Sequence, residues 1–128
     1  MNNLIVDAAR DEIFLTFIVS ENIYTCSHEN SKINFEKLMI LINEFLKNSK
    51  SSLDDIDVIY VNRGPGSFAG VRNSLSTVKA LFLTKEIDYY CFSFDDFKES
   101  KGIKYADVPQ LCKKYKIKKN LINPIYIS

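Results

Sequence analysis

The chain has 128 residues, 46% of them hydrophobic and 26% charged, with a net charge of +1. This length suits one domain with its own hydrophobic core, and no apolar run approaches the ~20 residues that cross a membrane. The N-terminus has no basic segment ahead of its short apolar run, so we expect no signal peptide, no membrane partner and a cytoplasmic location.

The cysteine and histidine content limits the chemistry open to the chain. Cys26, Cys91 and Cys112 are odd in number and widely spaced, which argues against a disulfide framework or a zinc site. His28 is the only histidine, so a metal site built from two histidines of one chain is excluded. We expect buried or bystander thiols, no metal site and no catalytic residue.

Three strands are predicted first, at residues 4–7, 12–19 and 22–27, because these segments are short and rich in branched and aromatic side chains. A helix over 34–48 follows, with Asn34 as its N-cap. Its segment LMILI (38–42) is apolar at five consecutive positions, which in a helix cannot all face one sheet. Either a second protein covers the surplus, or the helix lies between its own sheet and its own tail.

The pattern then continues as strand, helix and strand. Residues 58–61 form a continuous apolar strand, and the helix over 67–85 carries small residues beside its apolar stripe. The last strand is predicted at 89–94, where Ser93 or Asp95 caps a further turn. The order β-β-β-α-β-α-β indicates an α/β fold with a mixed five-stranded sheet and helices packed on it.

Charge divides the chain into two segments. Residues 1–97 carry 9 basic and 14 acidic groups, whereas 98–128 carry 8 basic and 2 acidic ones. We therefore divide the chain into a domain over 1–97 and a C-terminal segment over 98–128, with a short basic helix over 109–119 and an extended end. Such polarity favours an acidic partner or nucleic acid at the C-terminal end, although lysine-rich segments are more often solvated helix faces.

The stretch RGPGSFAGVR (63–72) holds three of the four glycines and lies where a strand gives way to a helix. Backbone N–H groups there can hold an anion, which makes Gly64, Gly66 and Ser67 weak anion-binding candidates. However, the stretch has neither the lysine of a P-loop nor the G-x-G-x-x-G spacing. A rigid turn is favoured instead, in which Ser67 caps the helix and Gly70 allows close packing.

This stretch also resembles a family signature. GPGSFAGVR is similar to the Gly-Pro-Gly-Ser-Phe-Thr-Gly-Leu/Val-Arg motif of the TsaB (YeaZ) family, with Ala69 as the only departure in the loop. The segments LDDIDVIYVN, CFSFDDF and NPIYIS resemble further elements of that family. The resemblance implies an actin-like (ribonuclease H-like) domain. It also implies a noncatalytic partner of the TsaD enzyme, which acts with the ATPase TsaE in threonylcarbamoyl modification of the tRNA adenosine next to the anticodon.

The resemblance also implies a partner surface on the two helices, which in the family bind TsaD or a second copy of the same chain. The residues expected there are Leu38, Met39, Leu41, Ile42, Ser76, Thr77, Ala80 and Leu83. Two departures matter: Asp7-Ala8-Ala9 replaces the family's Asp-Thr-Ser, and about thirty residues stand where relatives carry a second actin-like half. We therefore expect a vestigial second half and no nucleotide bound by this chain alone, with ATP or ADP at a partner interface left open.

Two alternatives remain at this point. The first is an actin-like nucleotide phosphohydrolase, or a peptidase-like enzyme, that uses Asp7 with the glycine stretch. The second concerns the lysine-rich segment KKYKIKK (113–119), which either contacts tRNA phosphates weakly, clasps the acidic body or mediates self-association.

Overall fold

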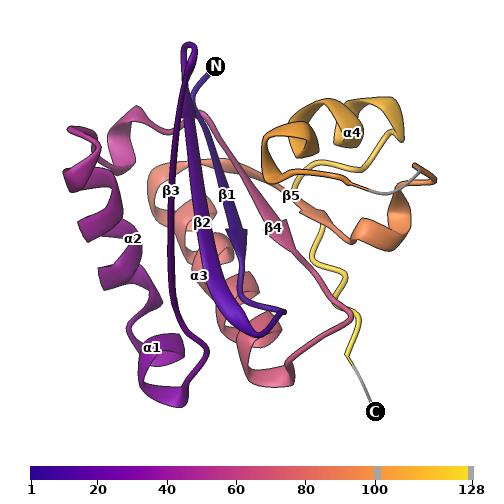
Figure 1. Ribbon diagram of the computed structural model, residues 1–128, viewed down its shortest axis with the longest axis horizontal. Coiled ribbons are helices and arrows are strands. Elements are labelled where there is room, and N and C mark those ends of the chain that lie inside the picture. The colour runs from indigo at the N-terminus through magenta and orange to yellow at the C-terminus, as the bar shows by residue number, and fades with distance from the viewer. Residues whose placement is uncertain (100–101, 127–128) are drawn as a thin grey trace.

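The computed structural model describes residues 1–99 and 102–126. One mixed sheet has the strand order β3-β2-β1-β4-β5 (Figure 1). Its strands are β1 (Asn3–Asp7), β2 (Glu12–Val19), β3 (Asn22–Glu29), β4 (Val58–Asn62) and β5 (Asp88–Phe92). The first three form an antiparallel meander, and β4 and β5 run parallel to β1. The predicted sheet and element order are therefore confirmed, and the carboxyl ends of β1, β4 and β5 meet at one edge.

Three helices cover the first face of the sheet: α1 (Lys32–Glu36), α2 (Leu38–Asn48) and α3 (Phe68–Lys85). The prediction of a single helix over 34–48 was wrong at its start. The first helix begins after Ser31, whose hydroxyl accepts the N–H of Asn34, and the helical path breaks at Lys37. The break gives α1 and α2 separate directions, so Phe35 of α1 and the apolar stripe of α2 both reach the same core.

The surplus of apolar residues on α2 is smaller than the sequence suggested. Leu38, Leu41 and Ile42 are buried in the first apolar cluster, which is the core between the sheet and the helices α1, α2 and α3. Met39 is half-buried against this cluster. Ile40 alone of the LMILI segment is largely exposed. The three buried side chains recur at helical spacing and continue through Phe45 and Leu46, which places them all toward the sheet.

The second face of the sheet is partly covered by the C-terminal segment. The 3-10 turn η2 (Phe94–Asp96) precedes this segment, which includes the 3-10 turn η3 (Tyr105–Asp107) and the helix α4 (Val108–Lys114). Val108, Leu111 and Cys112 pack with Ile5 and Tyr60 of the sheet in a second apolar cluster. The basic helix predicted over 109–119 is shorter, because the chain leaves the helical path after Lys114 and Lys116 has a positive φ.

The C-terminal segment also touches the body through charge. Lys119 lies 3.6 Å from the Asp88 carboxylate, and Asn120 bonds to both the backbone and the side chain at the start of β5. The segment thus packs on the body mainly through apolar side chains, and Lys119 is the one lysine of 113–119 that pairs with a described acidic residue of the body. Within residues 1–99 and 102–126, no helix is long and apolar enough to cross a membrane.

The glycine corner, residues 63–70 between the end of β4 and the first turn of α3, fixes the position of α3. A Cβ atom at Gly70 would lie 1.8 Å from the carbonyl oxygen of Ala8, and one at Gly66 would lie 2.1 Å from that of Ala9. Only glycine allows the first turn of α3 to approach the end of β1 so closely. Ser67 caps the helix by accepting the N–H of Gly70, as predicted.

Gly70→Ala is expected to lower the free energy of unfolding by about 1–3 kcal/mol, because the new methyl group must displace buried backbone. Urea denaturation measures this. Ser76→Ala, at an exposed position of the same helix, is the matched control and should change stability by less than about 0.5 kcal/mol. Equal stability of the two variants would contradict the close packing of this corner.

Candidate functional site

The carboxyl edge of the sheet is where a ligand site is expected, because open α/β sheets bind ligands outside the carboxyl ends of their parallel strands. Asp7 ends β1, Asn62 ends β4, and Ser93 follows β5. The glycine corner lies directly beside Asp7, since Gly66 and Gly70 touch the backbone of Ala8 and Ala9. The structure therefore brings Asp7 and the glycine stretch together, as the enzyme alternative requires.

The contacts of Asp7, however, are already made within the chain. Its side chain is fully buried, and one carboxylate oxygen accepts the N–H of Ala9 at 3.0 Å. The other accepts the hydroxyl of Tyr105, from η3, at 2.6 Å. Burial, together with the nearby Asp7 carboxylate, raises the pKa of Tyr105, so its hydroxyl remains a donor at neutral pH. Asp7 is thus held in a structural hydrogen bond.

Two backbone N–H groups at the start of the glycine corner are likewise engaged. The N–H of Gly64 donates to Asn62 Oδ1 at 2.9 Å, and the N–H of Ser67 donates to the Ala9 carbonyl at 3.0 Å. Gly64 has a φ of +105°, and a Cβ atom there would lie 2.1 Å from the carbonyl oxygen of Ile125. Among the three anion candidates, the N–H groups of Gly64 and Ser67 are therefore engaged in the turn itself.

Arg63 fastens the C-terminal segment over the same edge. Its guanidinium binds Asp96 with two hydrogen bonds, of 2.5 and 3.2 Å, and donates to the carbonyl of Asn123 at 3.1 Å. Its own carbonyl accepts the N–H of Ile125 at 2.7 Å. The chain between Asn123 and Ile125 is therefore fastened beside the end of β4.

Sequence reasoning missed Tyr105, Asp96 and Ile125 at this edge. Tyr105 is 98 residues from Asp7, and Arg63 is 33 residues from Asp96. Neither separation follows a helical or strand period, so no spacing in the sequence could have identified these pairs.

The cysteines offer no nucleophile. Cys91 and Cys112 are buried, and burial raises the pKa of each to about 12, so both remain thiols at neutral pH. Cys26 is half-buried on β3. The prediction of buried or bystander thiols is confirmed, and the described part of the chain has no cluster of three potential metal ligands.

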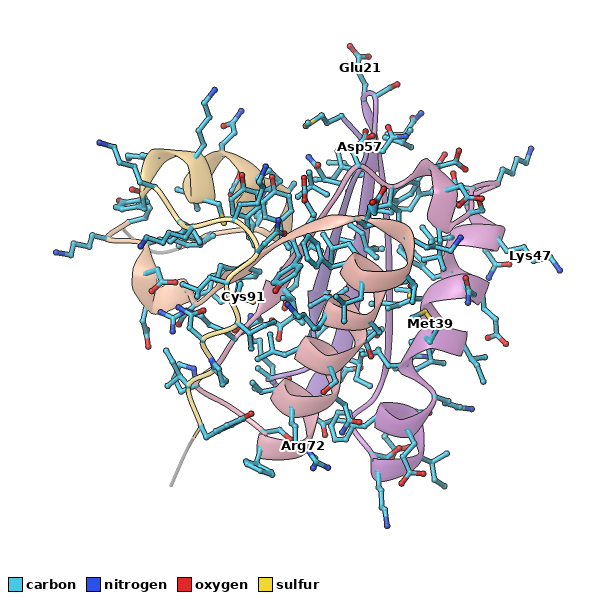
Figure 2. All side chains as sticks on the ribbon, turned by 180° about the vertical axis from the view of Figure 1, so that it is seen from behind. Glu21, Met39, Lys47, Asp57, Arg72 and Cys91 are labelled. Carbon is cyan, nitrogen blue, oxygen red and sulfur yellow. The ribbon has the colours of Figure 1, made fainter. Side chains whose placement is uncertain are left out.

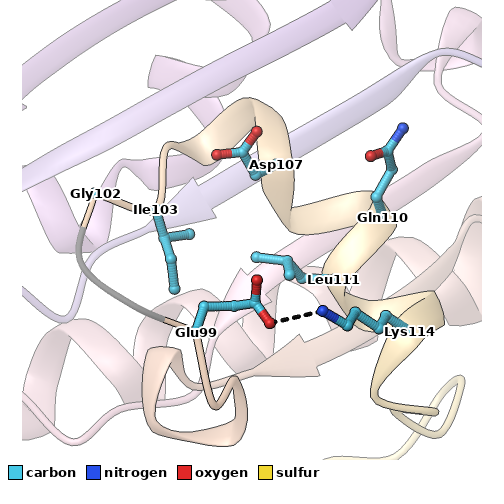
Figure 3. A pocket seen from close by; sticks show the side chains of 7 residues that line it. All are labelled: Glu99, Gly102, Ile103, Asp107, Gln110, Leu111 and Lys114. Carbon is cyan, nitrogen blue, oxygen red and sulfur yellow. Dashed lines mark hydrogen bonds and ion pairs between the residues drawn. The ribbon is translucent and has the colours of Figure 1, made fainter.

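A hollow of about 360 Å³ lies between η3, α4 and the segment that follows η2 (Figure 3). Its charged side chains satisfy one another: Lys114 pairs with Glu99 at 2.9 Å, and Tyr115 also donates to Glu99. These two donors lower the pKa of Glu99, so the carboxylate stays ionised and paired. Asp107 accepts the N–H of Lys104 and caps η3. Glu99, Lys114 and Asp107, among the described residues that line this hollow, are thus all engaged in bonds within the chain.

The helical face presents part of the predicted partner surface. Figure 2 shows α2 and α3 side by side on one face of the sheet, with α4 on the other side of the molecule. Ser76, Ala80 and Leu83 of α3 are exposed, and Thr77 is half-buried. Leu38, Leu41 and Ile42 belong to the core, so the expectation that these three side chains face outward needs correction. Ile40, which the prediction omitted, faces outward; it lies opposite the apolar stripe, and the helical period could have identified it.

A family model described as "TsaD: tRNA N6-adenosine threonylcarbamoyltransferase" matches residues 28–93, just over half of the chain. Two curated relatives, both named tRNA threonylcarbamoyladenosine biosynthesis protein TsaB, come from Buchnera aphidicola. That of subspecies Schizaphis graminum is 28% identical over 70% of this chain and 43% of its own length. That of subspecies Baizongia pistaciae is 35% identical over 54% of this chain and 36% of its own length.

Among solved structures, YeaZ from Pseudomonas aeruginosa superposes with a TM-score of 0.66 and 20% identity, over 72% of this chain and 43% of that one. The chain thus spans less than half the length of these relatives. The superposition supports the predicted actin-like fold, and the family model covers the helices and strands that flank the glycine corner. The chain therefore belongs to the family that this model describes and, within it, to the TsaB (YeaZ) proteins.

Proposed function

We propose that this chain is a noncatalytic TsaB-type subunit that binds a TsaD-like enzyme through the exposed side of α2 and α3, and so supports threonylcarbamoyl modification of tRNA. Its curated relatives carry a name from this pathway, which supports the pathway assignment. The single observation that carries the binding role is a helical face with apolar side chains in solvent, beside a sheet edge at which Asp7 and Arg63 are bonded within the chain.

The exposed side chains of this face suit a protein partner. Ile40 is 55% exposed on α2, and Leu83 is 68% exposed on α3. Ser76 and Ala80 are small and exposed, so a helix of the partner can approach α3 closely. Burial of the two large side chains would add about 1.5–3 kcal/mol each to the association. In the absence of a TsaD-like protein, the same face would accept a second copy of the chain.

The noncatalytic role is supported by the contacts of Asp7 and the glycine corner. A phosphohydrolase needs a carboxylate open to substrate or metal, and a phosphate loop needs free N–H groups. Here Tyr105 covers Asp7, and the N–H groups of Gly64 and Ser67 are bonded within the turn. We therefore propose that the isolated chain binds no nucleotide. ATP or ADP at the interface with the partner, and an accompanying TsaE-like ATPase, remain parts of the same proposal.

Ile40→Glu and Leu83→Glu are each expected to weaken binding to the TsaD protein of the same cell at least tenfold, because each buries a charge in the interface. Isothermal titration or biolayer interferometry measures the affinity.

Ile23→Glu is the matched control. Ile23 is also 55% exposed, but it lies on the edge strand β3. It pairs with Ile18, which packs against the second cluster, so Ile23 lies on the sheet face opposite α2 and α3. Its substitution should leave the affinity unchanged. Equal losses for Ile23 and Ile40, or no loss for Ile40 and Leu83, would count against the proposed face.

Tyr105→Phe tests the enzyme alternative. Loss of the hydroxyl leaves buried Asp7 with one donor fewer, so the free energy of unfolding should fall by about 1–3 kcal/mol. Removing this hydrogen bond from Asp7 should not create an enzyme, and magnesium-dependent nucleotide hydrolysis should stay at background in both the wild-type and the variant protein. Turnover in the wild-type chain, abolished by Asp7→Asn in a folded variant, would instead establish the phosphohydrolase.

A further inference from the structure

Lysines gather at the end of α4 and in the turn that follows it, on the side of the molecule away from α2 and α3. Five lysines occur between residues 113 and 119. Two are engaged: Lys114 pairs with Glu99 at 2.9 Å and Lys119 with Asp88 at 3.6 Å. Lys113, Lys116 and Lys118 are exposed and make no ion pair with residues 1–99 or 102–126. Their charges are therefore free for a ligand.

Two neighbouring hollows are lined by these free lysines. The first, of about 370 Å³, has Lys113 and Lys116 at its sides. The second, of about 280 Å³, has Lys116 and Lys118 together with Arg63 and Asp96. Lys116 and Ile117 belong to both hollows, so the two adjoin. Asp96 contributes little negative charge there, because the Arg63 guanidinium binds it through two hydrogen bonds.

The first hollow also contains two aromatic donors. The rings of Tyr60 and Tyr90 are stacked, with centroids 5.3 Å apart. Neither hydroxyl makes a hydrogen bond to the part of the chain that the structure describes. Burial raises the pKa of Tyr60 to about 12, which keeps its hydroxyl protonated and able to donate.

We infer that Lys113, Lys116 and Lys118, with the Tyr60 and Tyr90 hydroxyls, form a binding surface for the phosphate backbone of RNA. Adjoining cation-lined hollows fit successive phosphates of a chain better than one isolated anion, and neutral hydroxyl donors beside ammonium groups are common phosphate contacts. The surface lies on the face opposite α2 and α3, so RNA and a TsaD-like protein can be bound at the same time. The choice of tRNA as the RNA rests on the proposed function.

The test is the salt dependence of tRNA binding by the full-length chain, measured by fluorescence anisotropy with an unmodified tRNA transcript between 50 and 300 mM KCl. The variant Lys113→Gln/Lys116→Gln/Lys118→Gln keeps side-chain length and removes three charges. We expect at least a tenfold loss of affinity at the lowest salt. The slope of log K against log salt should be shallower by about one unit per lysine removed.

The matched control removes three charges elsewhere: Lys32→Gln/Lys37→Gln/Lys47→Gln changes exposed lysines of α1, α2 and their junction. Its slope should equal that of the wild-type chain. Equal losses in both triple variants, or no measurable binding by the wild-type chain, would overturn the inference. Displacement of tRNA by poly-glutamate at equal charge concentration would also overturn it and assign the surface to an acidic protein.

This test is separable from that of the proposed function. A chain that binds its TsaD-like partner but shows no lysine-dependent tRNA binding refutes this inference alone. A chain that binds tRNA through the three lysines but does not bind the partner refutes the docking proposal alone.

Discussion

The closure of the sheet's carboxyl edge is the constraint on which the rest of this molecule depends. Tyr105 donates to the buried carboxylate of Asp7, and Arg63 holds Asp96 and the carbonyl of Asn123. These bonds connect the end of β1, the end of β4 and the C-terminal segment. Because buried polar groups are costly when they lack partners, each bond both satisfies the edge and fixes the segment that covers it. Open α/β sheets commonly bind ligands outside this edge; here Asp7 is instead bonded to Tyr105 of the same chain.

With Asp7 and Arg63 bonded within the chain, the functions proposed here lie on two surfaces of the molecule. The glycine corner presses α3 against the end of β1, and that contact sets the angle at which Ala80 and Leu83 face solvent. On the opposite face, α4 covers the sheet with apolar side chains, and Lys113 of α4, with Lys116 and Lys118 after it, is exposed. The two faces differ in chemistry, one partly apolar and one basic. This division suits a small subunit that positions an enzyme and its RNA substrate without reacting with either.

The sequence alone was sufficient for the sheet, because β1, β2, β4 and β5 have compact apolar runs and β3 follows β2 after a short polar turn. It was also sufficient for the glycine corner, whose motif is local. It failed where distant segments meet: no period relates Tyr105 to Asp7. It also failed for Leu38, Leu41 and Ile42, because an apolar run in a helix was interpreted as surplus before its period was applied. That period predicts a buried stripe and leaves Ile40 outside.

Hydrogen exchange of the chain, alone and mixed with the TsaD-like protein proposed as its partner, tests most directly the claim that this protein works through its surfaces. The account predicts slower exchange in peptides that cover α2 and α3, with no change in peptides that contain Asp7 or the glycine corner. Slowing concentrated at Asp7 and residues 63–67, with α2 and α3 unaffected, would contradict it and return the carboxyl edge to a role in ligand binding.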